Sequence, residues 1–140
     1  MSWDSYITNL KTPDQSGQCP IEDAAICGIA DGTVWAGTPA FKQIQPNEIK
    51  RLAGNRSDFA QSGPMIAGIK CRLLRDNLDT EGMHVMDLKT AADAQGNTYS
   101  VCIGKTLQSI IIVKGTKEAS GGQISAKLHT ILDYLRKLSM

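Results

Sequence analysis

The chain lacks a run of about 18 consecutive apolar residues, the length that a membrane-spanning helix needs. Its start also lacks the basic and then apolar segments of a secretory signal, so we expect a cytosolic protein. Fifteen basic against fourteen acidic side chains leave a net charge of +1, which argues against nucleic acid as a partner. Cys19, Cys27, Cys71 and Cys102 form no C-x-x-C pair, so we expect reduced, mostly buried thiols and no metal.

Catalytic motifs are also missing. The chain has two histidines, His84 and His129, and neither accompanies a serine or cysteine pattern typical of an activated nucleophile. Carboxylates are scattered singly, so no acid and base pair stands out. Residues 104–106, Gly-Lys-Thr, imitate the end of a phosphate-binding loop, but Tyr99 occupies the position where that loop needs glycine. We therefore expect no enzyme and no cofactor.

What the chain does have is the composition of one globular domain. Its 140 residues are 41% hydrophobic and 21% charged, which predicts a single domain over residues 1–140 that folds unaided. Apolar residues recur at helical spacing over 3–10 and again over 124–138. Proline near its start and glycine after its end predict a further short surface helix at 46–53.

Short apolar runs separated by turn-forming residues predict a sheet. The expected strands are 24–29, 33–37, 65–67, 69–75, 83–89, 99–104 and 109–114. Regular spacing without long intervening helices favours antiparallel over parallel pairing. The fold class is therefore α+β: a central antiparallel meander with the N- and C-terminal helices packed on one face.

Aromatic residues are few, and their distribution is uneven. Trp3, Tyr6, Trp35 and Tyr134 lie on only three elements, the two terminal helices and one strand. One interpretation places all four in the core, since Trp and Tyr are largely buried in most proteins. The other is a ladder of exposed rings, which binds polyproline-II segments because their stiff backbone loses little entropy on docking. The position of Tyr134 at the edge of its helix's apolar stripe predicts partial exposure.

The sequence resembles the profilin family over essentially its whole length. Ser2 to Ile7 with Asn9-Leu10 is similar to the family's first helix, and Asp23 to Ile26 followed by Val34-Trp35-Ala36 is similar to its first hairpin. The further matching segments, in family order and spacing, are 68–71, 75–76, 86–90, 104–106 and the glycine pair at 121–122. It is the order of these segments together that carries the resemblance.

The resemblance implies an actin-monomer-binding protein (1:1) of the cytoplasm and cytoskeleton that regulates filament assembly and promotes nucleotide exchange on actin. It also implies binding of proline-rich proteins, such as formins and related assembly factors, and of polyphosphoinositide head groups at the membrane surface. The expected polyproline-binding residues are Trp3, Tyr6, Asn9, Trp35, Tyr134 and Met140. The expected actin-binding residues are Phe59, Lys70, Arg72, Leu73, Arg75, Lys89, Ser120, Gly122, Ser125 and His129. The expected phosphoinositide-binding residues are Lys70, Arg75, Lys89, Arg136 and Lys137.

Two other classes of function remain open from the residues themselves. One is a small α+β scaffold or trafficking domain whose aromatic residues form the core, and the exposure of the rings distinguishes it from the first. The other is a cysteine-dependent enzyme, which requires one thiol far more reactive than the rest.

Overall fold

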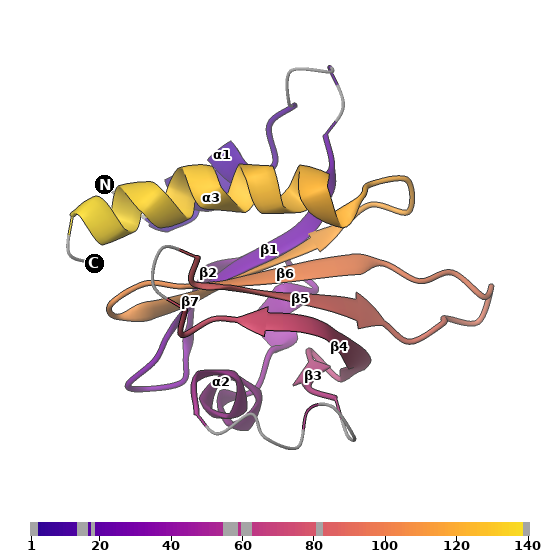
Figure 1. The fold of residues 1–140 in the computed structure, drawn as a ribbon, viewed down its shortest axis with the longest axis horizontal. Coiled ribbons are helices and arrows are strands. Elements are labelled where there is room, and N and C mark those ends of the chain that lie inside the picture. Colours follow the sequence, from indigo (N-terminus) through magenta and orange to yellow (C-terminus); the bar gives the residue numbers. More distant parts are fainter. Residues whose placement is uncertain are drawn as a thin grey trace.

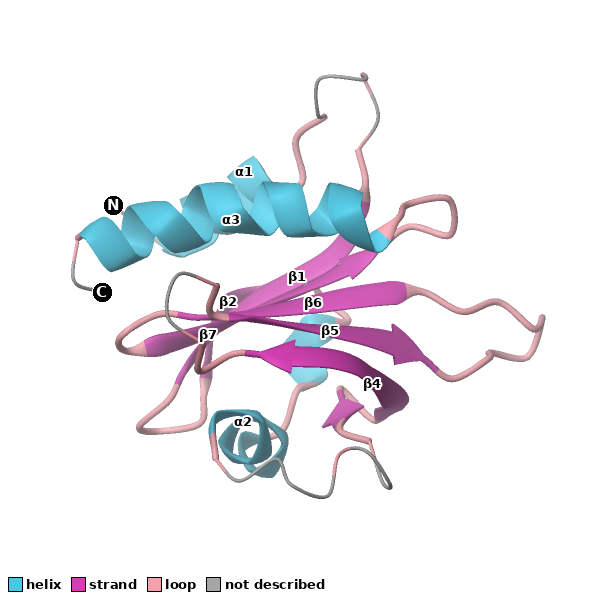
Figure 2. Ribbon diagram, in the orientation of Figure 1, coloured by secondary structure: helices cyan, strands magenta, loops and turns pink. Residues whose placement is uncertain are grey.

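The computed structural model describes residues 3–13, 17, 19–54, 59, 63–80 and 83–138. A curled sheet lies between helices on its two sides, with α1 and α3 on one side and α2 on the other (Figures 1 and 2). The elements in chain order are α1 (Trp3–Leu10), β1 (Ile21–Gly28), β2 (Val34–Gly37), the 3-10 helix η1 (Phe41–Gln43), α2 (Pro46–Ala53), β3 (Met65–Ile66), β4 (Ile69–Asn77), β5 (Val85–Thr90), β6 (Ser100–Lys105), β7 (Ser109–Gly115) and α3 (Gly121–Lys137).

The seven strands form one antiparallel sheet in the order β2-β1-β7-β6-β5-β4-β3. Strands β3 to β7 are a meander, whereas β1 joins that meander by pairing with β7, the last strand of the chain. The predicted α+β class, antiparallel sheet and terminal helices on one face are therefore confirmed. The β1–β7 pairing brings α1 and α3 onto the same side of the sheet, where they contact each other.

Each face of the sheet carries its own hydrophobic core. The first core lies under α1 and α3 and includes Leu10 and Leu128, each fully buried. The second core lies under η1 and α2 and includes Phe41, Ile49 and Leu52. The short surface helix predicted at 46–53 is confirmed as α2, and it buries its apolar side, Ile49 and Leu52, against the second face of the sheet. Strands β6 and β7 are almost entirely buried, as expected when both faces of a sheet are covered. In a sheet with one face exposed, apolar and polar residues would alternate more strictly along each strand.

Helix α2 also organises the edge of the sheet. Its capping box joins Gln45 and Glu48, and a proline occupies the first turn, where no amide donor is needed. The Glu48 carboxylate additionally accepts hydrogen bonds from the amides of Ala67 and Gly68, at 3.1 and 3.0 Å. These two residues have positive φ and make the tight turn from β3 to β4.

Helix α3 begins at a capping box formed by Ser120 and Gln123. Gly104 on β6 lets this helix approach the sheet closely, since a Cβ at that position would lie 3.2 Å from a methyl group of Leu132 and 3.3 Å from one of Leu128. Among the helices that the structure describes, none is long and apolar enough to cross a membrane.

Strand boundaries differ from the prediction by a few residues. Strand β1 begins at Ile21, before the polar pair Glu22 and Asp23, because backbone pairing with β7 extends it. His84, predicted inside a strand, lies just before β5 with a φ of 54°.

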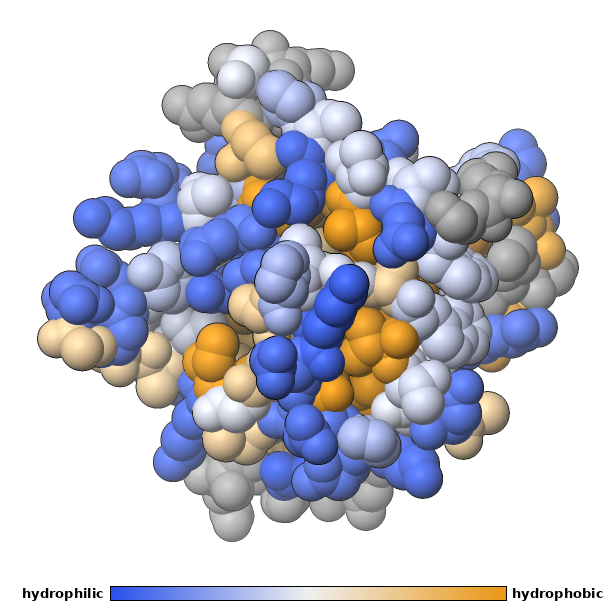
Figure 3. Space-filling view, turned by 180° about the vertical axis from the view of Figure 1, so that it is seen from behind, coloured by the Kyte–Doolittle hydropathy of each residue, from blue (hydrophilic) through white to orange (hydrophobic). Residues whose placement is uncertain are grey.

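On the face of the molecule seen from behind, hydrophilic side chains dominate and apolar residues form separate patches (Figure 3).

Candidate functional site

The four predicted aromatic residues form one continuous row. The ring centroids of Trp35 and Trp3 are 5.0 Å apart, those of Trp3 and Tyr6 are 5.5 Å apart, and those of Tyr6 and Tyr134 are 6.2 Å apart. All three pairs are tilted, between 38° and 48°. Strand β2, helix α1 and helix α3 thus each contribute to what we call the aromatic row: Trp35, Trp3, Tyr6 and Tyr134.

The aromatic row is buried in the core at Tyr6 and is partly exposed at its other three rings. Tyr6 is only 8% exposed and belongs to the first core, whereas Tyr134 is 43% exposed and Trp3 and Trp35 are half-buried. The partial exposure predicted for Tyr134 is confirmed. A purely internal role for all four rings does not fit this arrangement, because three of them present surface to solvent.

Polar groups border the aromatic row. The exposed Asn9 lies one turn along α1 from Tyr6, and its carbonyl oxygen accepts hydrogen bonds from the Thr12 hydroxyl at 2.6 Å and the Lys127 ammonium at 3.4 Å. The Lys127 contact joins α3 to the end of α1, and the Asn9 side chain remains at the surface. Met140, the other residue predicted here, lies outside the described residues.

Gly28 explains why the edge of the Trp35 ring can lie close against β1. A Cβ at this glycine would lie 2.7 Å from Cζ2 and 2.8 Å from Cε2 of Trp35, and it would also clash with Oδ1 of Asp31. Any side chain at position 28 therefore displaces the indole or the carboxylate. No pattern in the sequence predicted that Asp31 lies at the Trp35 end of the aromatic row.

A second surface lies where the N-terminal half of α3 borders β4 and β5. A cavity of about 530 Å³ there is lined by the predicted residues Arg75, Gly122 and Ser125, and by Leu74 and Asp87, which sequence reasoning missed. Ser120 caps α3 at this end, and His129 follows Ser125 by one helical turn. We call this surface, together with the outward side chains of β4 and β5, the open sheet face.

Basic residues continue the open sheet face along β4 and β5. Arg72 and Lys89 are direct cross-strand partners, and Lys70 lies two residues before Arg72, so the three side chains share one side of the sheet. They line a cavity of about 400 Å³. Lys70 and Arg72 are exposed, and the Lys89 ammonium lies 3.5 Å from the Ser100 hydroxyl.

Arg75, by contrast, already has a partner. Its Nε and Nη2 atoms both lie 3.2 Å from Oδ2 of Asp87 on the adjacent strand. The pair is at the surface, with the Arg75 side chain 68% exposed. Arg75 thus brings little unbalanced charge to the open sheet face.

Two of the predicted actin-binding residues lie elsewhere. Phe59 is only 1% exposed, within the second core and 4.9 Å beneath the guanidinium of Arg51, so it offers no surface to a partner. Leu73 also packs on the second core, whereas Leu74 is 53% exposed on the open sheet face. Regular alternation from the buried Cys71 places Leu73 on the side of the second core and Leu74 on the opposite side, and a β-bulge between Leu73 and Arg75 then keeps Arg75 on the same side as Leu74.

The five residues predicted to form one phosphoinositide patch are divided between two ends of the sheet. Lys70 and Lys89 lie where β6 begins, since Lys89 pairs with Ser100. Arg136 donates a 2.7 Å hydrogen bond to the carbonyl oxygen of Lys105, where β6 ends. Five strand residues separate these ends by about 17 Å. Arg136 and Lys137 therefore belong to a different surface from the lysines of the open sheet face.

Comparison with known proteins relates this architecture to a family. The sequence profile of the Profilin family matches residues 1–140. The chain belongs to the profilin family. Profilin-1 of Homo sapiens is 35% identical over 139 residues, which cover 96% of each chain. Mouse profilin IIa, solved in complex with a double repeat from the FH1 domain of mDia1, has a TM-score of 0.88 and 31% identity and covers 100% of each chain.

A more distant structure shares the profilin fold alone. LokiProfilin1, solved in complex with rabbit actin, is 14% identical, with a TM-score of 0.60 over 96% of this chain and 93% of its own. The sheet with its two terminal helices thus survives large sequence change within the profilin fold.

The thiols of this profilin are mostly inert. Burial, first of all, raises the pKa of Cys27, Cys71 and Cys102 to about 12, so these three stay protonated at neutral pH. Cys19 is exposed, and its sulfur donates to the Lys11 carbonyl oxygen at 2.7 Å. Among the residues that the structure describes, no three His, Cys, Asp or Glu side chains are grouped to hold a metal ion.

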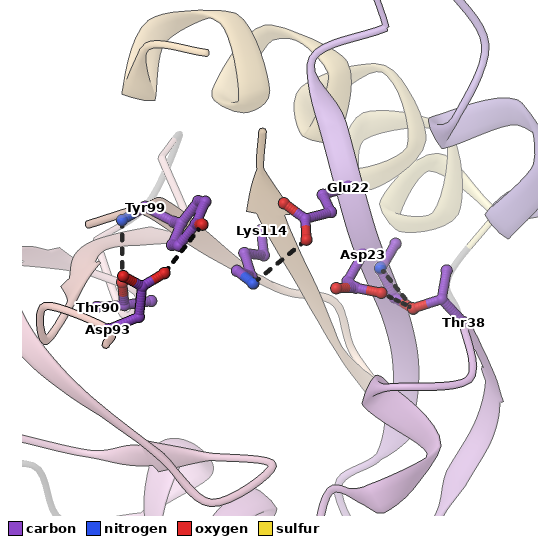
Figure 4. Close-up of polar contacts among 8 residues, drawn as sticks. Glu22, Asp23, Thr38, Thr90, Asp93, Tyr99 and Lys114 are labelled. Atoms are coloured by element: carbon purple, nitrogen blue, oxygen red, sulfur yellow. Dashed lines mark hydrogen bonds and ion pairs between the residues drawn. The ribbon is translucent and has the colours of Figure 1, made fainter. Parts of the chain in front are cut away.

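A polar cluster elsewhere on the profilin sheet has a structural role (Figure 4). The Lys114 ammonium lies 4.3 Å from the centroid of the Tyr99 ring and 3.6 Å from a Glu22 oxygen. The Tyr99 hydroxyl in turn donates to Asp93 at 3.2 Å, and the pKa of Tyr99 is raised by burial first and then by that carboxylate. These contacts join β1, β7 and the loop before β6.

Proposed function

We propose that this profilin binds actin monomers through the open sheet face and proline-rich segments through the aromatic row, and so supplies actin subunits to filament assembly. Promotion of nucleotide exchange on actin belongs to the same proposal. Support comes from family membership and from relatives solved with an FH1 double repeat and with actin. The observation that carries it is the row of four touching rings drawn from three separate elements.

The aromatic row suits a polyproline-II ligand for physical reasons. Proline rings lie flat on aromatic rings, and the ligand is already extended, so docking costs little conformational entropy. Because Tyr6 is buried in the first core, it fixes the positions of the neighbouring rings before the ligand binds. Asn9 is placed beside the row and can donate its side-chain amide to a ligand carbonyl oxygen.

Titration with decaproline tests this part of the proposal. Because Trp3 and Trp35 are both in the row, their fluorescence emission should change and saturate as the ligand binds. An unchanged emission, together with no binding by calorimetry, would overturn the assignment of the row to proline-rich ligands.

The open sheet face suits a protein partner. It combines an exposed leucine, Leu74, with basic side chains and a cavity beside the start of α3. Protein interfaces typically join apolar contacts at the centre to polar and charged groups at the rim. The polar side of this surface comes from α3 and its N-cap, with Ser120, Gly122, Ser125 and His129.

Phosphoinositide binding is proposed for the cationic part of the open sheet face, Lys70 with Arg72 and Lys89, and we expect it to depend strongly on salt. At 0.1 M ionic strength the Debye length is about 10 Å, so attraction between exposed ammonium groups and an anionic head group falls as salt rises. Polyproline affinity should hold, since ring stacking involves no net charge. Vesicle binding and decaproline binding across one salt series provide the comparison, and equal insensitivity of the two would refute the cationic site.

We also propose that the protein acts by binding alone, without catalysis, in the cytoplasm and at the cytoskeleton. The three protonated, buried thiols argue against the cysteine-dependent enzyme considered above.

A further inference from the structure

One charged side chain is built into the Trp35 end of the aromatic row. Asp31 lies in the connection between β1 and β2, and its carboxylate shares with the Trp35 indole the space above the Cα of Gly28. The indole atoms nearest that point, Cε2 and Cζ2, are at the ring edge that carries the N–H group. The carboxylate and the N–H edge of the ring are therefore neighbours.

The position of this carboxylate is fixed. Its Oδ1 accepts a hydrogen bond from the Thr33 amide at 3.1 Å, and the turn is closed by bonds from the Gly28 amide to the Thr33 carbonyl and from the Gly32 amide to the Gly28 carbonyl. Hydrogen bonds from the backbone and side chain of Thr33, and then from the Trp35 side chain, lower the pKa of Asp31. The group is exposed and remains ionised at neutral pH.

We propose that Asp31 selects, among proline-rich segments, those with a lysine or arginine next to their prolines. This inference rests on the proposed function of the aromatic row. The carboxylate also positions Trp35, since it holds the N–H edge of the indole against β1 and leaves the ring face toward Trp3, 5.0 Å away.

The dimensions of the row indicate where the selected residue lies. The three centroid separations limit the row to about 17 Å, which six residues of polyproline II cover at about 3.1 Å each. A residue that follows the sixth proline therefore passes beyond the last ring. At the Trp35 end it meets the Asp31 carboxylate, whereas the Tyr134 end lies toward the last turn of α3, which carries the basic residues Arg136 and Lys137. The two ends of the row thus differ in charge.

The experiment uses three blocked hexaproline peptides, titrated against the full chain at low salt. The neutral peptide has glycine on both sides of the prolines, and each of two lysine peptides replaces one of those glycines, either before or after the prolines. Both are needed because a polyproline-II segment can lie on the rings in either direction. The tighter of them should bind roughly two- to fivefold better than the neutral peptide, as expected for an exposed ion pair. In Asp31→Asn this gain should vanish, since asparagine retains the oxygen that accepts the Thr33 and Trp35 hydrogen bonds but not the charge.

Glu118→Gln is the matched control. It removes one negative charge from the loop after β7, at the far end of β1 from Asp31, and should leave the gain intact. A gain that is absent in the wild type, or that persists in Asp31→Asn, would overturn the inference while the neutral peptide still reports an intact aromatic row. Failure of all three peptides and of decaproline to bind would overturn the proposed function, and this inference with it.

Discussion

Replacing Trp3 by alanine is expected to weaken decaproline binding at least thirtyfold. Trp3 is one of the two inner rings of the row and touches Trp35 at 5.0 Å and Tyr6 at 5.5 Å, so its loss separates Trp35 from the other rings. Loss of an anchoring aromatic residue costs on the order of 2 kcal/mol or more, which corresponds to a factor of about thirty. Isothermal titration calorimetry provides the measurement, because the variant retains only one tryptophan for fluorescence.

Tyr99→Leu is the matched control for this substitution. Tyr99 is a half-buried aromatic residue on another part of the sheet, in contact with Lys114 and outside the row. Its loss should leave decaproline affinity unchanged, so a general effect of removing one aromatic ring can be separated from the loss of the row. If Trp3→Ala is folded by circular dichroism and binds decaproline as tightly as the wild type, Trp3 is not part of the ligand site.

Local patterns in the sequence predicted the elements well. Helical spacing of apolar residues marked α1 and α3, and turn residues marked the strand order from β4 to β7. Pairing of β1 with β7 is a contact between residues far apart in the chain, which short-range periodicity does not encode. The sequence patterns did not predict this pairing; the resemblance to a family supplied only the expectation that the aromatic residues at positions 3, 6, 35 and 134 lie together in one site.

The site residues that sequence reasoning misplaced depend on packing. Alternation along β4 places Leu73, like the buried Cys71, against the second core and leaves Leu74 exposed, but which side of the strand is covered depends on the packing of η1 and α2 on that face. Phe59 was expected on the actin-binding surface, but it is buried in the second core. Asp31 was missed because its contact with Trp35 depends on the absence of a side chain at Gly28.

The structure also decides which charges are worth reversing on the open sheet face. Arg75 is bound to Asp87, so a glutamate at position 75 would place two carboxylates together and lower the stability of the fold itself. Lys70 and Arg72 are both exposed and lie on one side of β4. They are the better pair for a test of actin binding.

The double variant Lys70→Glu, Arg72→Glu is expected to bind monomeric actin at least tenfold more weakly than the wild type, chiefly through slower association. Reversed charges at an interface remove favourable pairs, introduce repulsion and oppose the electrostatic steering of the partner. Stopped-flow association with labelled actin at two salt concentrations gives both the rate and its dependence on salt. The difference from the wild type should shrink at high salt, where the charges are screened.

Lys42→Glu, Lys50→Glu is the matched control, since it changes the net charge by the same amount on the opposite side of the sheet, in η1 and α2, where both side chains are exposed. Because the open sheet face is the proposed contact, this control should bind actin with nearly the wild-type rate, apart from a small loss from the altered net charge. Decaproline affinity should be unchanged in both double variants, as the aromatic row lies on other elements. Equal losses of actin binding in the two double variants would show that net charge alone governs association, and the open sheet face would then no longer be the assigned actin site.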